Sequence, residues 1–348
     1  MASETLDTHR RCAPSLSIEG NPASAAKVPS MKRGARQGGV CWFVALVAFV
    51  FSYTSCPALD SEPAPLAPQS LLLDITRAGS RLVAVGDRGH VLLSDDEGRT
   101  WKQVIVPTRA MLTGVSFCDE KHGWAVGHDG VILATTDGGQ TWSLQKSDAT
   151  LETVFLDVSF SSPLSGLAAG AYGKCLFTVD GGKTWQPAAP IPDEVHINHI
   201  TLTKTGTLYL SGEVGTLLVS EDAQKPWRKL EVPYEGSLFG LLPLDTRTLL
   251  TYGLRGNVFI SQDAGTSWTP RQMPIPVLIM AGVRLKSGPI VLAGLGGNFF
   301  ISPQGIATFA HWQPAEYNGG VSALIEATDG ALIAVGEKGA VRLQLPIK

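Results

Sequence analysis

Short runs in which hydrophobic and polar residues alternate recur along the chain from residue 71 onward. Examples are LTGVSF from Leu112, VFLDVSF from Val154 and INHITL from Ile197. A period of two places the apolar side chains on one face of a β-strand, and glycine-rich turns separate the runs. The pattern therefore predicts an all-β chain of short antiparallel strands.

A pair of glycines three residues apart recurs seven times and marks an internal repeat. Successive pairs begin 41, 43, 42, 41, 41 and 42 residues apart. A short β-type run precedes each pair and another follows it, as expected for two strands joined by a tight turn. The pairs are Gly86 and Gly89, Gly127 and Gly130, Gly170 and Gly173, Gly212 and Gly215, Gly253 and Gly256, Gly294 and Gly297, and Gly336 and Gly339.

A tryptophan after the glycine pair keeps the same period and opens a further strand in each of six units. These residues are Trp101, Trp142, Trp185, Trp227, Trp268 and Trp312. Units of about 40 to 45 residues with four strands are typical of β-propeller blades, whereas an open solenoid would need atypical capping repeats. We predict a seven-bladed β-propeller of four-stranded antiparallel blades over residues 71–348.

The last unit retains three strands, through VRLQL from Val341, but lacks a fourth strand that begins with Trp. Residues 57–70 are rich in proline and are expected to form an extended tether. We also expect this segment to supply the missing strand and so to join the two ends of the ring. Proline is tolerated there only at an outer edge, where ladder hydrogen bonds are absent.

Residues 40–53 form an uncharged stretch of 14 residues that follows Lys32, Arg33 and Arg36. A spanning helix needs about 20 apolar residues, whereas this length suits the hydrophobic core of a signal peptide. We assign residues 31–56 to a signal peptide and expect translation to start at Met31, which makes residues 1–30 a misassigned extension. The alternative start is Met1. The propeller is then exported and periplasmic.

The residues before Cys56 resemble a bacterial lipobox, in which small residues precede a cysteine that is lipidated. Tyr53 stands where an aliphatic residue is usual. Three outcomes stay open: lipidation of Cys56 with attachment to a membrane, cleavage nearby such as after Ala58, or an uncleaved anchor. Each of them exports the folded body.

The charge of the chain and the spacing of its cysteines limit the classes of partner and the kinds of site that we expect. Residues 1–56 carry six Lys or Arg and three Asp or Glu, so the other 292 residues carry 22 and 28, a net charge of −6. An acidic body argues against nucleic acid as a partner. None of the five cysteines has the spacing of a metal site, and Cys118 and Cys175 are expected to be small buried hydrophobes. We expect no cofactor and no metal.

A string of the form S/T-x-D-x-G-x-S/T-W ends at four of the tryptophans, and the copies before Trp227 and Trp312 have decayed. Asp can accept backbone N–H bonds in the turn, Gly can take a positive φ, and Trp can cover the apolar space between neighbouring sheets. Because the four aspartates lie in different blades, we expect them to be structural and not catalytic. They are Asp96, Asp137, Asp180 and Asp263.

The string resembles the Asp-box of sialidase-type (BNR) repeats. The longer stretch GWAVGHDGVILATTDGGQTW from Gly123 resembles the repeat of the photosystem II stability/assembly factor family. The resemblance covers about residues 71–343 and implies an exported seven-bladed propeller, often lipid-anchored. In photosynthetic members it implies a chaperone-like factor for reaction-centre subunits. The sequence itself does not show photosynthesis.

One face of the predicted disk, the tip face, collects the tips of the glycine pairs and the links between blades. Loops on a rigid scaffold carry function, and Arg, Tyr and Met are enriched at interfaces. We predict that this face binds a membrane protein or a subunit of an envelope complex. The candidate residues are Asp87, Arg88, Arg109, His128, Asp129, Tyr172, Glu213, Tyr234, Arg255, Tyr317 and Lys338.

The sequence favours a monomeric, non-enzymatic binding or assembly module. One alternative is a sialidase-like glycoside hydrolase, which needs three converging arginines such as Arg88, Arg109 and Arg255, but spacing supports no Tyr/Glu pair. Another is glycan binding through exposed aromatic residues such as Tyr172 and Tyr317. His196 and His199 are expected to point to opposite faces and so to form no metal site.

Overall fold

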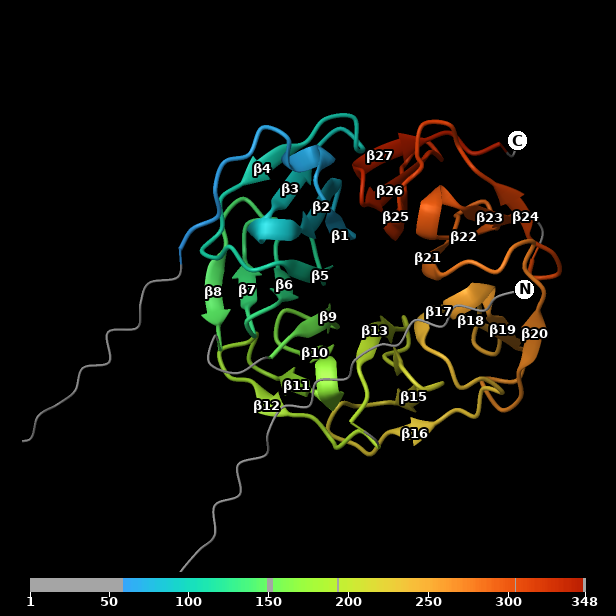
Figure 1. Ribbon diagram of the computed structural model, residues 1–348. Helices are drawn as coiled ribbons and strands as arrows, with labels where there is room; N and C mark the ends of the chain where they lie inside the picture. The colour runs from blue at the N-terminus through green and yellow to red at the C-terminus, as the bar shows by residue number, and fades with distance from the viewer. Residues whose placement is uncertain (1–58, 149–152, 193, 304, 347–348) are drawn as a thin grey trace, which may run out of the picture. The chain divides into compact units, whose positions relative to one another are not determined.

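The computed structural model describes residues 59–148, 153–192, 194–303 and 305–346, which form seven antiparallel sheets arranged in a ring (Figure 1). The predicted seven-bladed β-propeller is confirmed. Six blades have four strands, and the described part of the last blade has three. The helices of the described residues are five short 3-10 turns, none of them long and apolar enough to cross a membrane.

The strands run from the centre of the ring outwards in chain order. Blades 1 to 3 consist of β1 (Leu72–Ala78), β2 (Arg81–Gly86), β3 (Val91–Ser94) and β4 (Lys102–Val104); β5 (Leu112–Phe117), β6 (Gly123–Gly127), β7 (Ile132–Thr135) and β8 (Ser143–Lys146); and β9 (Phe155–Phe160), β10 (Gly166–Gly170), β11 (Cys175–Thr178) and β12 (Gln186–Pro187).

Blades 4 to 7 repeat this order. They consist of β13 (Ile197–Leu202), β14 (Leu208–Gly212), β15 (Leu217–Ser220) and β16 (Arg228–Lys229); β17 (Leu238–Pro243), β18 (Leu249–Gly253), β19 (Val258–Ser261) and β20 (Thr269–Arg271); β21 (Ile279–Arg284), β22 (Ile290–Gly294), β23 (Phe299–Ser302) and β24 (Ala310–Trp312); and β25 (Val321–Glu326), β26 (Leu332–Gly336) and β27 (Gly339–Leu343).

The core is divided into seven hydrophobic clusters, one at each junction between blades. Between blades 1 and 2, for example, Val83 and Leu93 pack with Leu133 and Trp142. Strands such as β3 and β6 are buried along their whole length because neighbouring blades cover both faces. Trp142 fills the junction with the preceding blade, as the sequence predicts.

The first glycine of each pair allows a close backbone approach within the blade. A Cβ on Gly127 would lie 2.0 Å from the carbonyl oxygen of Met111, which precedes the inner strand β5. The next amide, of His128, donates to that same oxygen at 3.0 Å. The equivalent bond, 2.9 to 3.1 Å long, forms in all seven blades, with donors Asp87, His128, Ala171, Glu213, Leu254, Leu295 and Glu337.

The second glycine joins its blade to the link that follows. Gly215, at φ +64°, donates its amide to Gly236 at 2.9 Å, and an added Cβ would lie 2.0 Å from the carbonyl oxygen of Tyr234. A positive φ and the absence of a Cβ are both required here. The amides of Gly130 and Gly173 make the equivalent bond to their links, with Thr153 and Val195 as acceptors at 2.8 Å. In blades 2 to 4 the glycine pair therefore fixes the tip face at two points.

Each inner strand has a break in its register after the first residue, and one residue bulges toward the axis of the ring. In β1 the partners skip from Leu72 to Asp74. The bulged residues are Leu73, Thr113, Leu156, Asn198, Phe239, Met280 and Ser322.

Residues 59–70 form a strap across the tips of blade 1 instead of the expected closing strand. No strand forms in this segment; residues 67–69 make the 3-10 turn η1 (Ala67–Gln69). Its prolines lack the amide donors that a ladder needs, which explains the failed prediction. The amide of Ser61 donates to the Val106 carbonyl at 2.8 Å, and Ser70 Oγ lies 2.8 Å from His90 Nδ1.

The strap replaces the missing link between the last blade and the first. A Cβ on Gly339 would lie 1.9 Å from the carbonyl oxygen of Pro68, just as a Cβ on Gly215 would meet Tyr234. Ala67 is fully buried in the cluster that contains Ala331 and Ile333 of blade 7. The ends of the ring are thus joined by packing and not by a shared ladder.

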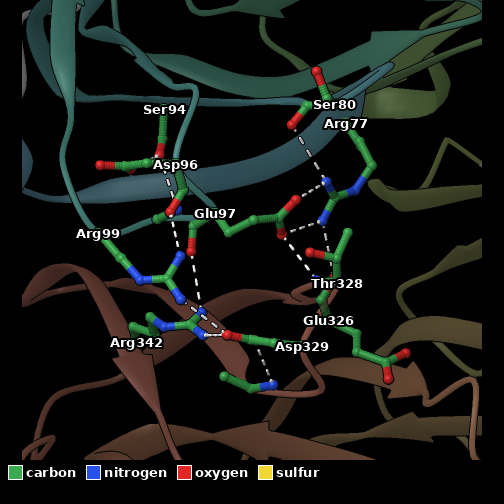
Figure 2. Close-up of polar contacts among 12 residues, drawn as sticks. Arg77, Ser80, Ser94, Asp96, Glu97, Arg99, Glu326, Thr328, Asp329 and Arg342 are labelled. Carbon is green, nitrogen blue, oxygen red and sulfur yellow. Dashed lines mark hydrogen bonds and ion pairs between the residues drawn. The ribbon is translucent and has the colours of Figure 1, made fainter.

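Hydrogen bonds of Glu97 and an ion pair between Arg99 of blade 1 and Asp329 of blade 7, at 3.0 Å, add a second closure between these blades (Figure 2). Glu97 accepts two hydrogen bonds from Arg77, at 2.8 and 3.0 Å, and one from the amide of Thr328 at 3.0 Å. The hydrogen bonds from Arg77 are the main reason that the pKa of Glu97 is lowered. Arg342 donates to the Glu97 carbonyl at 3.2 Å and pairs with Asp329.

Replacement of Gly127 by alanine should lower the free energy of unfolding by about 3 kcal/mol or more, because the methyl group and the Met111 carbonyl cannot occupy the same space. Gly206→Ala is the control: this turn has φ +89° but open space around it, so backbone strain alone should cost about 1 kcal/mol. Urea unfolding measures both. Equal losses would contradict the steric explanation.

Replacement of Glu97 by glutamine should lower the free energy of unfolding by about 1–3 kcal/mol. The substitution weakens the charged hydrogen bonds from Arg77 within blade 1 and the bond from the Thr328 amide of blade 7. Glu221→Gln, which weakens an exposed pair with Lys225 at 3.4 Å, should change stability by less than about 0.5 kcal/mol. Thermal unfolding followed by circular dichroism distinguishes them. A Glu97 variant as stable as the control would show that the network does not close the ring.

Candidate functional site

The middle residue of six tip turns adopts the left-handed conformation, and the five that are not glycine are exposed. Arg88, Tyr172 and Val214 have φ of 53 to 55°. The Arg88 side chain is 82% exposed, and Tyr172 and Val214 are 68% and 63% exposed. Left-handed backbone is unfavourable for side chains with a Cβ, most of all for a β-branched one. The tips thus hold side chains where glycine would be less strained.

The predicted binding residues are distributed over all the blades except blade 6, whose tip turn is η5 (Leu295–Gly297). Tip turns carry Asp87, Arg88, His128, Asp129, Tyr172, Glu213, Arg255 and Lys338, and links carry Arg109, Tyr234 and Tyr317. Ten of the eleven are exposed or half-buried, and Tyr317 is buried.

Tyr317 belongs to the core and not to the surface. Its side chain is 1% exposed, it lies edge-on to Phe299, and its hydroxyl donates to the Gly320 carbonyl at 2.8 Å. Burial raises its pKa to about 12. The link turns its ring under the tip of blade 6, where Gly297 approaches the Tyr317 carbonyl. The sequence predicted Tyr317 as an exposed residue of a link, so the prediction that it belongs to the binding face is wrong.

Two other link residues hold the scaffold. Arg109 donates through Nε to the Asp60 carbonyl at 2.8 Å and pairs with Glu62 at 2.7 Å, so it fixes the strap. The hydroxyl of Tyr234 donates to the Leu254 carbonyl at 3.2 Å. The Glu213 carboxylate at the tip of blade 4 is engaged as well, since it accepts from the His196 amide at 3.3 Å. The side chains of Arg88, Tyr172 and Arg255 are exposed at the tips.

The predicted binding set contained Tyr172 but left out the aliphatic members of this face, Val214 and Leu295. Val214 and Leu295 are exposed at the tips of blades 4 and 6, and Tyr172 packs edge-on against His196 with 4.8 Å between ring centroids. Such residues carry no reactive group, so no motif singles them out. Their position between paired glycines is the signal that identifies them.

The opening of the central channel on the tip face is a cavity of about 370 Å³. Its walls come mainly from the second to fourth residues of the inner strands, which begin at this face. The lining residues are Leu73, Asp74, Ile75, Thr113, Leu156, Asp157, Asn198, His199, Phe239, Tyr252, Met280, Ala281, Gly282, Ser322, Ala323 and Leu324.

Two aspartates at this opening also tie neighbouring blades together. Asp74 accepts from its neighbour Ile75 and from Val115 of blade 2, both at 2.8 Å. Asp157 accepts from Ile200 of blade 4 at 2.7 Å, and the same oxygen lies 2.7 Å from His199 Nδ1. Each carboxylate thus satisfies backbone amides at a bulge.

These groups alter one another's pKa. Burial first, and then the charge of Asp157, raise the pKa of Asp74 to about 7. Burial alone would lower the pKa of His199, but the charge of Asp157, their hydrogen bond and the charge of Asp74 together raise it. The channel opening therefore contains a carboxyl group, that of Asp74, with a pKa of about 7, and an imidazole, that of His199, whose pKa is raised.

The two histidines named from the sequence lie in different surroundings, His196 against Tyr172 and His199 in the channel. Within the described ranges, no three His, Cys, Asp or Glu side chains are grouped as metal ligands. Cys175 is buried, as expected, whereas Cys118 is half-buried; both are free thiols.

The repeated aspartates organise the turns between third and fourth strands. Asp96 accepts from the Thr100 amide at 2.8 Å and from its hydroxyl at 2.6 Å, and these bonds lower its pKa to about 2. Asp137, Asp180 and Asp263 make the same two bonds. In the decayed copy, Asp222 accepts from Gln224 instead. This is the turn chemistry that the string predicts.

The comparisons with known proteins agree with these repeats. A family model described as "Photosynthesis system II assembly factor YCF48" matches residues 93–152 and 143–343. The chain is 38% identical over 79 residues to the chloroplastic photosystem II stability/assembly factor HCF136 of Cyanidioschyzon merolae, which covers 22% of this chain and 17% of the relative. It is 45% identical over 42 residues to the photosystem II assembly protein Ycf48 of Thermosynechococcus vestitus, covering 12% of each.

Two solved structures have a similar fold. One, described as YCF48 bound to D1 peptide, has a TM-score of 0.67 and 22% identity, over 84% of this chain and all of the other. The second, YCF48 from Cyanidioschyzon merolae, has a TM-score of 0.67 and 18% identity, over 81% and 98% of the two chains. At these identities the likeness concerns the fold.

The stability of the protein should fall as the pH rises from about 4 to 7, because the folded state retains a proton on Asp74 that the unfolded state loses near pH 3.8. The raised pKa of His199 acts in the same direction above pH 6.5. Urea unfolding at pH 4.5 and 7.5 should show a larger loss for the wild type than for Asp74→Asn. Equal losses in the two proteins would contradict the assignment.

Proposed function

This chain belongs to the photosynthesis system II assembly factor YCF48 family, and from that membership we propose that it is an exported, non-enzymatic module that binds a membrane protein during assembly. The partner contributes a peptide segment outside the membrane, or a subunit of an envelope complex. The tip face of the propeller is the binding surface. The protein acts as a monomeric propeller without a cofactor.

One observation supports this assignment above the others: the tips share one backbone geometry but differ in side chain. Five of them hold a residue other than glycine in the left-handed region, namely Arg88, Asp129, Tyr172, Val214 and Arg255. Strain that a glycine would relieve is typical of positions retained for function. The exposed set combines basic, acidic, aromatic and aliphatic groups, which suits a peptide of mixed composition.

The relatives support a peptide as the class of partner. A similar propeller is described as bound to D1 peptide. The matched segments span only 17% and 12% of the curated relatives, so the identity of the partner here is part of the proposal. A membrane-protein segment is the class of partner that this likeness favours.

The arrangement of charged groups disfavours the sialidase alternative. Such an enzyme needs converging arginines at the channel, but no arginine is among the described residues that line it. Arg109 is engaged by the strap, and Arg88 and Arg255 lie on blades 1 and 5. The glycan-binding alternative loses one of the two aromatic residues on which it rests, because Tyr317 is buried, whereas Tyr172 is exposed.

The segments that would export the protein lie outside the described residues. We propose that residues 31–56 direct export to the periplasm and that Cys56 carries a lipid, with residues 1–30 upstream of the true start. The first described residues, from Leu59, already belong to the strap on the tip face. A lipid at Cys56 would therefore tether the propeller close to this face.

Removal of Arg88 and Arg255 together should reduce recovery of the partner from detergent-solubilised membranes at least several-fold, because both guanidinium groups project from the tips. The matched control is Arg228→Ala with Arg247→Ala, which removes two exposed arginines on β16 and on the turn before β18. Crosslinking with mass spectrometry identifies the bound segment. Equal losses in the two variants would contradict the tip face as the site.

Replacement of Val214 by glycine should raise the free energy of unfolding by about 0.5–1 kcal/mol, because glycine relieves the strain at φ +53°. The same variant should bind the partner more weakly. Leu295→Gly, an exposed tip residue without a positive φ, should gain no stability. If the Val214 variant binds the partner as well as the wild type does, the proposal that this strained residue is retained for binding is contradicted.

A further inference from the structure

The turn between β15 and β16 retains the repeated aspartate but not the residues that hold it in the intact copies. In blade 2 the Asp137 carboxylate accepts from the Thr135 hydroxyl at 2.8 Å and from the amide and hydroxyl of Thr141 at 2.9 and 2.6 Å. In blade 4, Pro226 stands at the position of Thr141 and provides neither donor. The Asp222 carboxylate is therefore released from its turn.

The released carboxylate keeps one hydrogen bond among the described residues, from the Gln224 amide to Oδ1 of Asp222 at 2.9 Å. The Ser220 hydroxyl, whose counterpart in blade 2 donates to the carboxylate, donates instead to the backbone carbonyl of Asp222 at 2.8 Å. Because Asp222 is half-buried, its Oδ2 is a partly desolvated acceptor that gains from a charged donor. The copy before Trp312 has lost the aspartate, so this feature belongs to blade 4.

Asp222 lines a groove between blades 3 and 4, a cavity of about 350 Å³ on the face opposite the tips. The lining also includes Val179, which is 55% exposed, and part of the turn of residues 161–165, whose Leu164 is 60% exposed. An apolar surface thus continues from inside the groove to its edge. The other large apolar residues of the lining are Leu167, Phe177, Leu202 and Leu208.

The charge at the groove favours a cationic group. The described lining includes Glu221 and Asp222 but no lysine or arginine; Lys183 and Lys204 of the neighbouring turns are exposed and do not line it. Glu221 pairs with Lys225 at 3.4 Å, which leaves Asp222 to meet a ligand. A small ion would leave the apolar walls in contact with water, whereas lysine and arginine combine a charged head with an apolar stem.

We propose that this groove binds a lysine or arginine side chain of a partner protein, in a segment where an apolar residue stands next to it. The charged head pairs with Asp222, and the stem packs on the apolar lining. The neighbouring apolar side chain contacts the exposed Val179 and Leu164. The groove and the tips lie on opposite faces, so this proposal does not rest on the function proposed above.

Titration of the isotope-labelled protein with the peptide acetyl-Ala-Leu-Arg-Leu-Ala-amide, followed by amide signals in NMR spectra, tests the proposal. We expect saturable shifts at Ser165, Thr178 and Gln224, and about tenfold weaker binding when uncharged citrulline replaces the arginine. Asp222→Asn should weaken binding of the arginine peptide about tenfold, the effect of one charged hydrogen bond. Glu120→Gln, which removes an exposed carboxylate from the cavity between blades 1 and 2 on the same face, should bind like the wild type.

Repair of the turn provides a second variant. Gln224→Gly with Pro226→Thr restores the string, so the turn should engage Asp222 again, raise the unfolding temperature and weaken peptide binding about tenfold. The protein without Arg88 and Arg255 should bind the peptide like the wild type, which separates the groove from the tip face. No saturable binding, equal binding of the citrulline peptide, or unchanged affinity after Asp222→Asn or after the repair would overturn the proposal.

Discussion

A close approach of two backbone segments at the first glycine of each pair determines the rest of this structure. At this point the amide after the second strand donates to the carbonyl that precedes the inner strand, at 2.9 to 3.1 Å in every blade. Since a Cβ would lie within about 2–2.5 Å of that oxygen, only glycine permits the bond. The start of the inner strand, its bulge and the adjoining tip are thereby placed together, and so is the face on which the proposed function depends.

The two ends of the ring are also joined by a close backbone approach at a glycine, but without a shared ladder. The described part of the last blade has three strands, so no ladder spans the two ends of the chain. The strap of residues 59–70 instead takes the place of a link, with Pro68 against Gly339, and Glu97 accepts hydrogen bonds from both blades (Figure 2). The same strap crosses the tip face, which makes the amino-terminal segment part of the surface that we assign to binding.

The repeat could be predicted from the sequence because the same packing requirements recur along the ring. The close backbone approach requires glycine in every blade, and the junction between blades is filled by tryptophan in six of the units. The burial of Tyr317 could not be predicted, since it depends on how one link turns under the tip of Gly297. The channel was missed for another reason: the bulge shifts the alternation by one residue. Asp74, Asp157 and His199 all follow the bulge and thus occupy equivalent positions of the repeat, so alignment of the seven units would have placed them in one ring.

Amide hydrogen exchange of the seven residues that donate these repeated bonds tests the account most directly. Asp87, His128, Ala171, Glu213, Leu254, Leu295 and Glu337 stand at turns, where amides ordinarily exchange fast. If the close approach holds every blade, all seven should be protected to nearly the extent of the buried β-strand amides, blade 7 included. Fast exchange at these positions while the strands stay protected would show that the tips are not fixed by this bond.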